Sequence, residues 1–449
     1  MQEPKTLEGF GSNTFDNLTT LHPLGVLVLA LGIIGTLIVQ RRYAWLPLLL
    51  IACFVSTSQR VVIATLDFNF VRLMIAAATL RIIQRREFSG LRITTLDKLI
   101  TAWVIVNALA YVLRVGTFSS LVFKLGMSYD SLGLYLLGRT WLRSGEDLRR
   151  FARAAGILAC ISGVAFAIEW STGRNIFSIF GGVSEFTQIR QERLRCQGPF
   201  SHPILAGAFW LSPLALILAL VWSPRGKPIA IAGALSISAI TFFCSSSTPL
   251  LGWIATAGFA SLWFLRKRTA ILRIGTVCTL VALHLIMEAP VWHLIARASV
   301  VGGSTGYHRY KLIDAFINNW SEWFLVGVSS TAHWGWFLFD VANQFVMEGT
   351  DGGILTLVLF LLILHRAFAN IGRRIRRART KQHAIEAWAI GTAIAAQCVM
   401  FIGVTISQTN TNMVMFVWLL AASEAKWGYA RSSGSGGPND LHAPTIANS

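Results

Sequence analysis

The chain has 449 residues, of which 54% are hydrophobic and only 13% are charged. Soluble domains carry about 25% charged residues, so the composition excludes an ordinary soluble enzyme. Apolar runs of about 16–22 residues recur along the whole length, and runs of that length span a bilayer as helices. The sequence therefore predicts an all-α, polytopic integral membrane protein.

Twelve or thirteen segments are predicted to span the membrane. The weakest are 43–58, which Pro47 interrupts, and 248–265, which opens on Ser-Thr-Pro. The first twenty residues are polar and mixed in charge, so we expect no cleavable signal peptide. The predicted spans are 22–39, 43–58, 61–83, 98–118, 121–142, 151–170, 203–222, 228–244, 248–265, 270–287, 352–368, 385–405 and 411–427.

The net charge of +18 is concentrated in every second loop. Basic loops remain in the cytoplasm, so we expect an outward N-terminus, a cytoplasmic C-terminus and outward loops at 171–202 and 288–351. The basic run 373–379 could suggest a nucleic-acid contact. A juxtamembrane cluster that meets anionic lipid headgroups is the favoured interpretation, and no nucleic acid is expected as a partner.

The span pattern predicts four regions. These are an N-terminal bundle (1–287), a long extracytoplasmic loop with short helices (288–351), C-terminal spans (352–427) and a disordered cytoplasmic tail (428–449). The tail is rich in Gly, Ser and Pro. The cysteines are scattered, so we expect neither a disulfide framework nor a metal site, and no cofactor motif is present.

The first outward loop is rich in arginine, against the charge bias elsewhere. Arg193 and Arg195 offer the planar, permanently charged fork that suits a pyrophosphate, although a solvated loop with local ion pairs is an equal alternative. His202 precedes Pro203 at the start of the next span. Its side chain is expected either at the membrane interface or facing a site.

The second outward loop contains an amphipathic pattern from Tyr307 to Trp320. The pattern predicts a surface helix with its apolar face down, with His308 and Arg309 in the first turn. Free backbone N–H groups there favour an anion, so Arg309 is a candidate phosphate ligand, or else it contacts lipid headgroups. The apolar face is predicted to hold Tyr310, Ile313, Phe316 or Ile317, and Trp320.

Aromatic residues fill the rest of this loop, around His333 and before Asn343. An interfacial aromatic belt is the default interpretation, and a groove that stacks sugars is the alternative. Arg72 is predicted midway along the span 61–83. An intramembrane arginine faces the bundle interior, either paired with Asp67 or reaching a lipid pyrophosphate.

These features resemble the superfamily of O-antigen ligases and O-antigen polymerases, which includes exopolysaccharide polymerases. The similarity covers about residues 60–425 and consists of short, degenerate motifs. The matching stretches are Arg195-Cys-Gln-Gly-Pro-Phe-Ser-His202-Pro203, Cys244-Ser-Ser-Ser-Thr248, Arg309 with Leu325-Val-Gly327-Val, and Asn343-Gln-Phe345 with Gly352-Gly353.

The resemblance implies inverting, metal-independent glycosyl transfer at the outer face of the bacterial inner membrane, in cell-surface polysaccharide biosynthesis. The donor would be a glycan on undecaprenyl pyrophosphate, held by arginines, and the acceptor a glycan, lipid or protein. A histidine would take the proton of the acceptor hydroxyl. Other polysaccharide-assembly proteins are possible partners.

The chain departs from the family pattern at Ala342, where a histidine is usual, and it lacks the familiar Ser-Arg pair near Thr248. His308 is the favoured replacement, followed by His333 and His202. The alternatives are a polysaccharide transporter or flippase, and a non-catalytic membrane subunit. Ala342 in place of the usual histidine favours the second of these.

The charge pattern makes a prediction about topology. Single cysteines at Ser184 and Ser329 of a cysteine-free protein should react with an impermeant maleimide in intact cells, whereas a cysteine at Thr380 should not. Labelling at position 380 from outside would overturn this topology.

Overall fold

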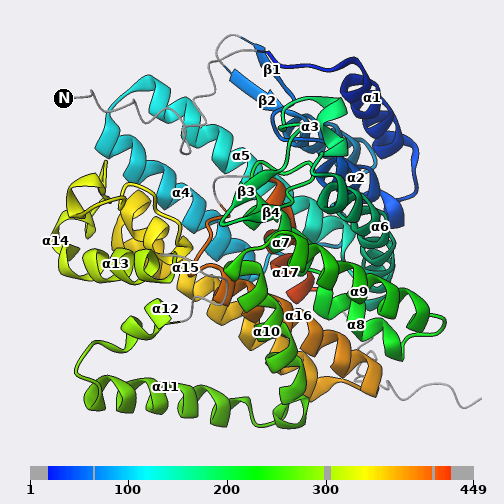
Figure 1. Cartoon of the computed structure of the whole chain (residues 1–449). Coiled ribbons are helices and arrows are strands. Elements are labelled where there is room, and N and C mark those ends of the chain that lie inside the picture. The colour runs from blue at the N-terminus through cyan, green and yellow to red at the C-terminus, as the bar shows by residue number, and fades with distance from the viewer. Residues whose placement is uncertain (1–18, 64–65, 298–304, 407–409, 426–449) are drawn as a thin grey trace, which may run out of the picture.

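The computed structural model describes residues 19–63, 66–297, 305–406 and 410–425. Helices dominate these residues, and two short hairpins complete them (Figure 1). The hairpins are β1 (Arg60–Ile63) with β2 (Leu66–Asn69), and β3 (Gln188–Arg190) with β4 (Arg193–Arg195), both antiparallel. The all-α class predicted from the sequence is confirmed.

The helices follow the predicted spans in order. In the first half they are α1 (Pro23–Ile38), α2 (Leu46–Phe54), α3 (Phe70–Gln84), α4 (Thr95–Val115), α5 (Phe118–Trp141), α6 (Gly145–Thr172), α7 (Pro203–Leu211), α8 (Leu214–Ala219) and α9 (Lys227–Phe243). In the second half they are α10 (Ser247–Ser261), α11 (Thr269–Ile286), α12 (Leu294–Arg297), α13 (Thr305–Asn318), α14 (Trp320–Trp323), α15 (Gln344–Arg377), α16 (Lys381–Met400) and α17 (Asn410–Ser423). Short 3-10 turns lie at Arg41–Tyr43, Ile176–Phe180, Leu220–Trp222, Leu262–Leu265, Val291–His293 and Ala332–Trp334.

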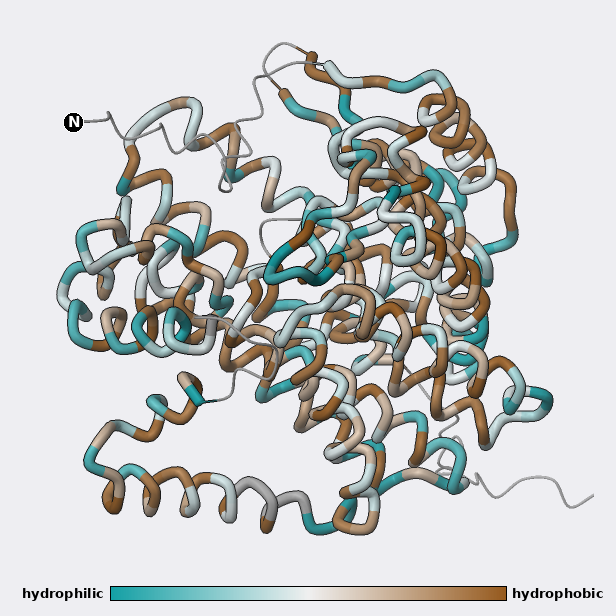
Figure 2. The backbone as a smooth tube through the Cα atoms, in the orientation of Figure 1, coloured by the Kyte–Doolittle hydropathy of each residue, from teal (hydrophilic) through white to brown (hydrophobic). Residues whose placement is uncertain are grey.

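Five helical stretches among the described residues are long and apolar enough to cross a membrane. A sixth arises if α11 and the segment 291–297, bent by 96°, form one broken span. Hydrophobic residues line the peripheral helices such as α1 and α11 (Figure 2), and many of them are exposed. These are the features of a polytopic membrane protein. The five stretches are Thr95–Val115, Gly145–Thr172, Pro203–Trp222, Ser247–Leu265 and Gln344–Arg377.

The core of the bundle lies around α17, which is buried along its whole length. This helix packs against α5, while α4 packs against α15, α6 against α9 and α10 against α16. Small residues allow α6 and α9 to approach each other closely. A methyl group built on Gly233 of α9 would lie only 3.0 Å from the Cα of Gly156 in α6. Such small-residue contacts are typical of helix pairs in membranes.

The segment predicted as a span at 61–83 is only partly helical. Its first part forms the β1–β2 hairpin, and α3 begins at Phe70 because the side chain of Asn69 accepts a hydrogen bond from the Arg72 amide at 3.0 Å. Arg72 therefore lies in the first turn of α3 rather than midway along it. The weak span 43–58 contains only the nine-residue helix α2.

The predicted long loop folds around a small core of its own, next to the start of α15 (Figure 1). The amphipathic helix expected from Tyr307 to Trp320 is present as α13. Its buried face agrees with the prediction at Phe316 and differs elsewhere: Arg309 and Leu312 are also buried, whereas Trp320 is 57% exposed. The predicted tail 428–449 lies outside the described residues.

Candidate functional site

Arg195 is presented by the β3–β4 hairpin, whose two-residue turn has positive φ at Gln191 (51°) and Glu192 (61°). Positive φ at both central positions is typical of the tight type I′ turn that matches the twist of paired strands. Arg193 lies exposed beside the turn, whereas Arg195 at the end of β4 is only 5% exposed. The two arginine candidates of this loop therefore have different environments.

The buried carboxylate of Glu169, near the end of α6, holds the chain that follows Arg195. It accepts hydrogen bonds from the backbone amides of Gln197 and Gly198, both at 3.0 Å, and from the Thr187 hydroxyl at 3.3 Å. A carboxylate accepts such bonds strongly. Glu169 thus fixes the loop behind Arg195, a role that sequence analysis did not assign.

The Arg195 guanidinium is not neutralised by any described acidic residue. Its Nε is buried without a hydrogen-bond partner, and no carboxylate among the described residues pairs with it. Burial, with the nearby Arg190, lowers its pKa, while the Cys244 thiol lies close enough to oppose that shift. A buried, unpaired guanidinium is the expected state of a group that meets an anionic ligand.

Arg309 of α13 is also buried, at 7% exposure. Its Nη2 donates to the Thr248 hydroxyl, which donates in turn to the Gly403 carbonyl at 3.3 Å. The guanidinium rests on Gly403, because a methyl group built there would lie 2.5 Å from the Arg309 Cζ. No described carboxylate forms an ion pair with Arg309.

The two arginines converge on one short segment, Cys244–Thr248. The residue after Arg195 is bonded at its beginning, where the Cys196 amide donates to the Phe243 carbonyl at 3.0 Å, and Arg309 is bonded to Thr248 at its end. The start of α7 packs against the same segment, where a methyl group on Gly207 would be 3.6 Å from the Cys244 sulfur. Two candidates from the loops 171–202 and 288–351, 114 positions apart in the sequence, thus both lie beside this polar stretch.

His202 forms the N-cap of α7, where its Nδ1 accepts a hydrogen bond from the Ile204 amide at 3.1 Å. Burial, together with the positive charges of Arg195 and Arg190, lowers its pKa to about 4. An accepting Nδ1 must be unprotonated, so the imidazole is neutral at neutral pH. His202 is therefore a neighbour of Arg195 with a structural capping role.

The other two histidine candidates lie in the folded loop. His308 Nε2 is 3.2 Å from the Asp340 carbonyl, which also accepts from the Ala342 amide at 3.0 Å. The His308 ring therefore adjoins Ala342. His333 is 55% exposed and contacts Glu322 at 2.6 Å.

The Asn343 side chain caps helix α15, and its amide oxygen and nitrogen are already hydrogen-bonded within the protein. Its side chain accepts from the Phe345 and Val346 amides, at 2.9 and 3.2 Å, and donates to the Ile402 carbonyl at 3.4 Å. It is 1% exposed. Asn343 therefore joins the start of α15 to the segment 401–406, the same segment on which Arg309 rests.

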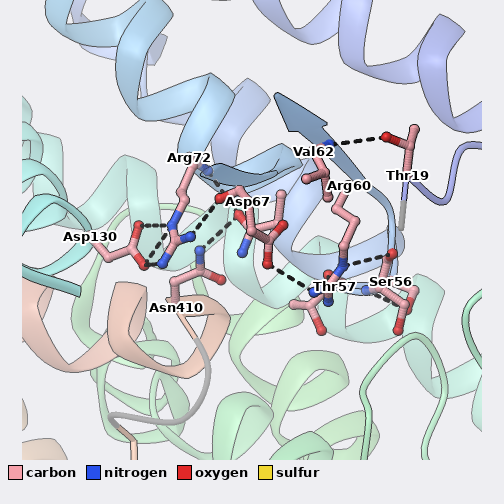
Figure 3. Close-up of polar contacts among 11 residues, drawn as sticks. Thr19, Ser56, Thr57, Arg60, Val62, Asp67, Arg72, Asp130 and Asn410 are labelled. Atoms are coloured by element: carbon pink, nitrogen blue, oxygen red, sulfur yellow. Dashed lines mark hydrogen bonds and ion pairs between the residues drawn. The ribbon is translucent and has the colours of Figure 1, made fainter. Parts of the chain in front are cut away.

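Arg72 has a full set of protein partners (Figure 3). Its guanidinium pairs with Asp130 of α5 at 2.9 Å and donates to the Asp67 carbonyl oxygen at 2.6 Å. The expected pair with the Asp67 carboxylate is not formed, because that carboxylate binds Arg60 at 2.8 Å. The structural alternative for Arg72 fits these contacts better than a pyrophosphate role.

No family model matches this chain, and no curated protein matches it significantly.

The depressed pKa of His202 predicts a pH dependence of stability. Its folded pKa of about 4 lies below the ordinary value near 6.5, so the unfolded chain binds the extra proton in between. Above about pH 6.5, His202 is neutral in both states and does not lower the free energy of unfolding. Between pH 6.5 and 4 the unfolded chain takes up the proton first, so the free energy of unfolding falls as the pH drops. His202→Asn keeps a capping side chain but does not titrate, so its melting temperature should depend less on pH across this range. Parallel curves for the two proteins would contradict the assignment.

The Arg72–Asp130 pair predicts a rescue experiment. Asp130→Ala leaves a buried guanidinium unpaired, a loss that costs about 3–5 kcal/mol in buried pairs. The double variant Arg72→Met/Asp130→Leu leaves no charge and should regain most of the thermal stability in detergent. If the double variant is as stable as the wild type but inactive, Arg72 has a role in the site and the structural assignment is wrong.

Proposed function

We propose that this chain is a membrane glycosyltransferase of the O-antigen ligase and polymerase type. It would transfer or polymerise a glycan carried on undecaprenyl pyrophosphate at the outer face of a bacterial inner membrane. The observation that supports this proposal most is the pair of buried arginines, Arg195 and Arg309, on the segment Cys244–Thr248 without a described carboxylate partner.

The other buried arginines of the bundle make this pair distinctive. Arg60, Arg81 and Arg139 each pair with an aspartate or glutamate within 2.9 Å. A buried cation without a counter-ion is costly, so the protein retains one where a ligand supplies the charge. A pyrophosphate supplies that charge and accepts the bidentate hydrogen bonds of arginine.

The proposed reaction breaks the bond between the anomeric carbon of the donor and the pyrophosphate oxygen. The electron pair leaves with the pyrophosphate, where the two guanidinium groups offset the developing charge. The acceptor oxygen attacks the anomeric carbon, and its proton passes to a base. His308 is the favoured base because its ring adjoins position 342 beside the asparagine cap; His333 and His202 are the alternatives.

This function requires an outward-facing site. We therefore extend the proposal to twelve or thirteen spans, an outward N-terminus, a cytoplasmic C-terminus and outward loops at 171–202 and 288–351. The alternating Lys and Arg clusters support this orientation. The acceptor in this scheme is a glycan or a lipid-linked saccharide.

The proposal is tested by comparing Arg195→Ala and Arg309→Ala with Arg193→Ala. Losing one charge-assisted contact costs about 1.5–3 kcal/mol, so each of the first two should lower transfer from a purified lipid-linked oligosaccharide by about ten- to a hundred-fold. Lysine should restore only part of the activity, because it lacks the planar fork.

Arg193 is the matched control, since it lies two positions from Arg195 on the same strand but is exposed. Its replacement should have a much smaller effect. Unchanged transfer in the Arg195 and Arg309 variants at equal protein levels would refute the arginine role. Absence of transfer by the wild-type protein would favour a non-catalytic subunit.

A further inference from the structure

The folded loop that contains α13 and α14 sorts its aromatic side chains into two groups. Phe316 and Trp323 stack inside its small core, with ring centres 3.9 Å apart. Other large apolar side chains are exposed in two short segments, 320–325 and 336–339, and Trp336 is 87% exposed. We call the exposed set the apolar patch: Trp320, Phe324, Leu325, Trp336, Phe337 and Phe339.

The two segments of the apolar patch lie side by side. The Glu322 carboxylate, from the first segment, accepts a hydrogen bond from Trp334 Nε1 at 2.9 Å. The same carboxylate contacts His333 Nε2 at 2.6 Å. Trp334 is followed after one residue by Trp336, so this carboxylate joins both segments into one region of the loop surface.

A strained turn displays the second segment. Phe337 has a φ of 61°, in the left-handed region that is unfavourable for a bulky side chain. The turn is held from inside, because the Leu338 side chain is buried and its carbonyl accepts a hydrogen bond from the Thr331 hydroxyl. Leu338 is thus anchored, whereas Trp336 and Phe337 are exposed. Backbone strain that the surrounding structure maintains is found at functional contacts.

The apolar patch adjoins the exposed apolar face of α15, and α13 and α14 lie beside the start of that helix (Figure 1). The Phe324 carbonyl accepts from the Ile354 amide at 2.8 Å, and a methyl group on Gly353 would lie 2.2 Å from the Leu325 carbonyl oxygen. Helix α15 is long and apolar enough to cross a membrane, so exposed apolar side chains after Gly353 are positioned to meet lipid. They are Leu355, Val358, Leu361 and Leu362.

We propose that the apolar patch inserts into the interfacial layer of the bilayer, at the level where α15 enters the membrane. The occupant of the patch is a lipid surface. Tryptophan and phenylalanine suit this layer, because their rings are accommodated between the headgroups and the acyl chains. Continuity with the exposed face of α15 favours lipid over a sugar as the partner of these rings. The inference does not depend on the proposed glycosyl transfer.

The test measures the depth of the patch in a bilayer. Trp336→Cys and Trp320→Cys are made separately in the cysteine-free protein, and each is labelled with an environment-sensitive fluorophore. Lys311→Cys is the matched control, since Lys311 is an exposed, charged residue of α13 in the same loop. The proteins are reconstituted into phosphatidylcholine vesicles, with and without lipid that carries a nitroxide on the upper part of its acyl chain.

The nitroxide lipid should lower the fluorescence at positions 336 and 320 by about twofold or more, and it should change the control much less. Phe339→Cys replaces either variant that fails to fold. Equal quenching of the control, or no quenching at folded patch positions, overturns the proposal. A blue-shifted but unquenched fluorophore at 336 also overturns it, because the patch would then be buried against protein. Neither donor nor acceptor is present, so failure of the proposed function would not affect this result.

Discussion

Pairing of buried charges across helices is the constraint on which the rest of this bundle depends. Helix α5 contributes three such pairs, through Lys124, Asp130 and Arg139. These residues bind α15, α3 and α4 respectively. A charge removed from water is costly unless it is paired, so each bond fixes the partner helix in one position along α5. The polar residues of α5 therefore specify the arrangement of the helices that surround it.

Two polar regions of the bundle differ in how they meet this constraint. The region beside α5 contains a balanced pair, Lys124 with Asp351, and the Glu348 carboxylate, which neutral donors hold. The arginine site has two buried guanidinium groups without described acidic partners. A fold that neutralises its other buried arginines and leaves two uncompensated on one segment has the electrostatic character of an anion site.

The sequence was sufficient to predict the helical class and the approximate helix positions, because long apolar runs depend only on local composition. It also marked two candidates: Arg195, because arginine in a loop expected to face outward opposes the usual charge bias, and Arg309, because it lies at the start of the predicted helix. It did not reveal the partner of Arg72, because Asp130 lies 58 positions away and the pairing depends on how α3 packs against α5. The buried face of α13 was predicted only in part for a related reason: hydrophobic spacing did not show that Arg309 would be buried against Thr248.

Helix α15 connects two polar regions of the bundle. Its first turns place Asn343, Gln344 and Glu348 in succession, and the first two bind the segment 401–406 while the third accepts a hydrogen bond from Trp103 of α4. The helix then breaks at Gly353, whose φ of 75° disfavours residues with a side chain. A methyl group there would lie 2.2 Å from the Leu325 carbonyl oxygen, so the folded loop packs directly on the break. The segment before Gly353 is therefore tied to the loop that bears His308 and Arg309.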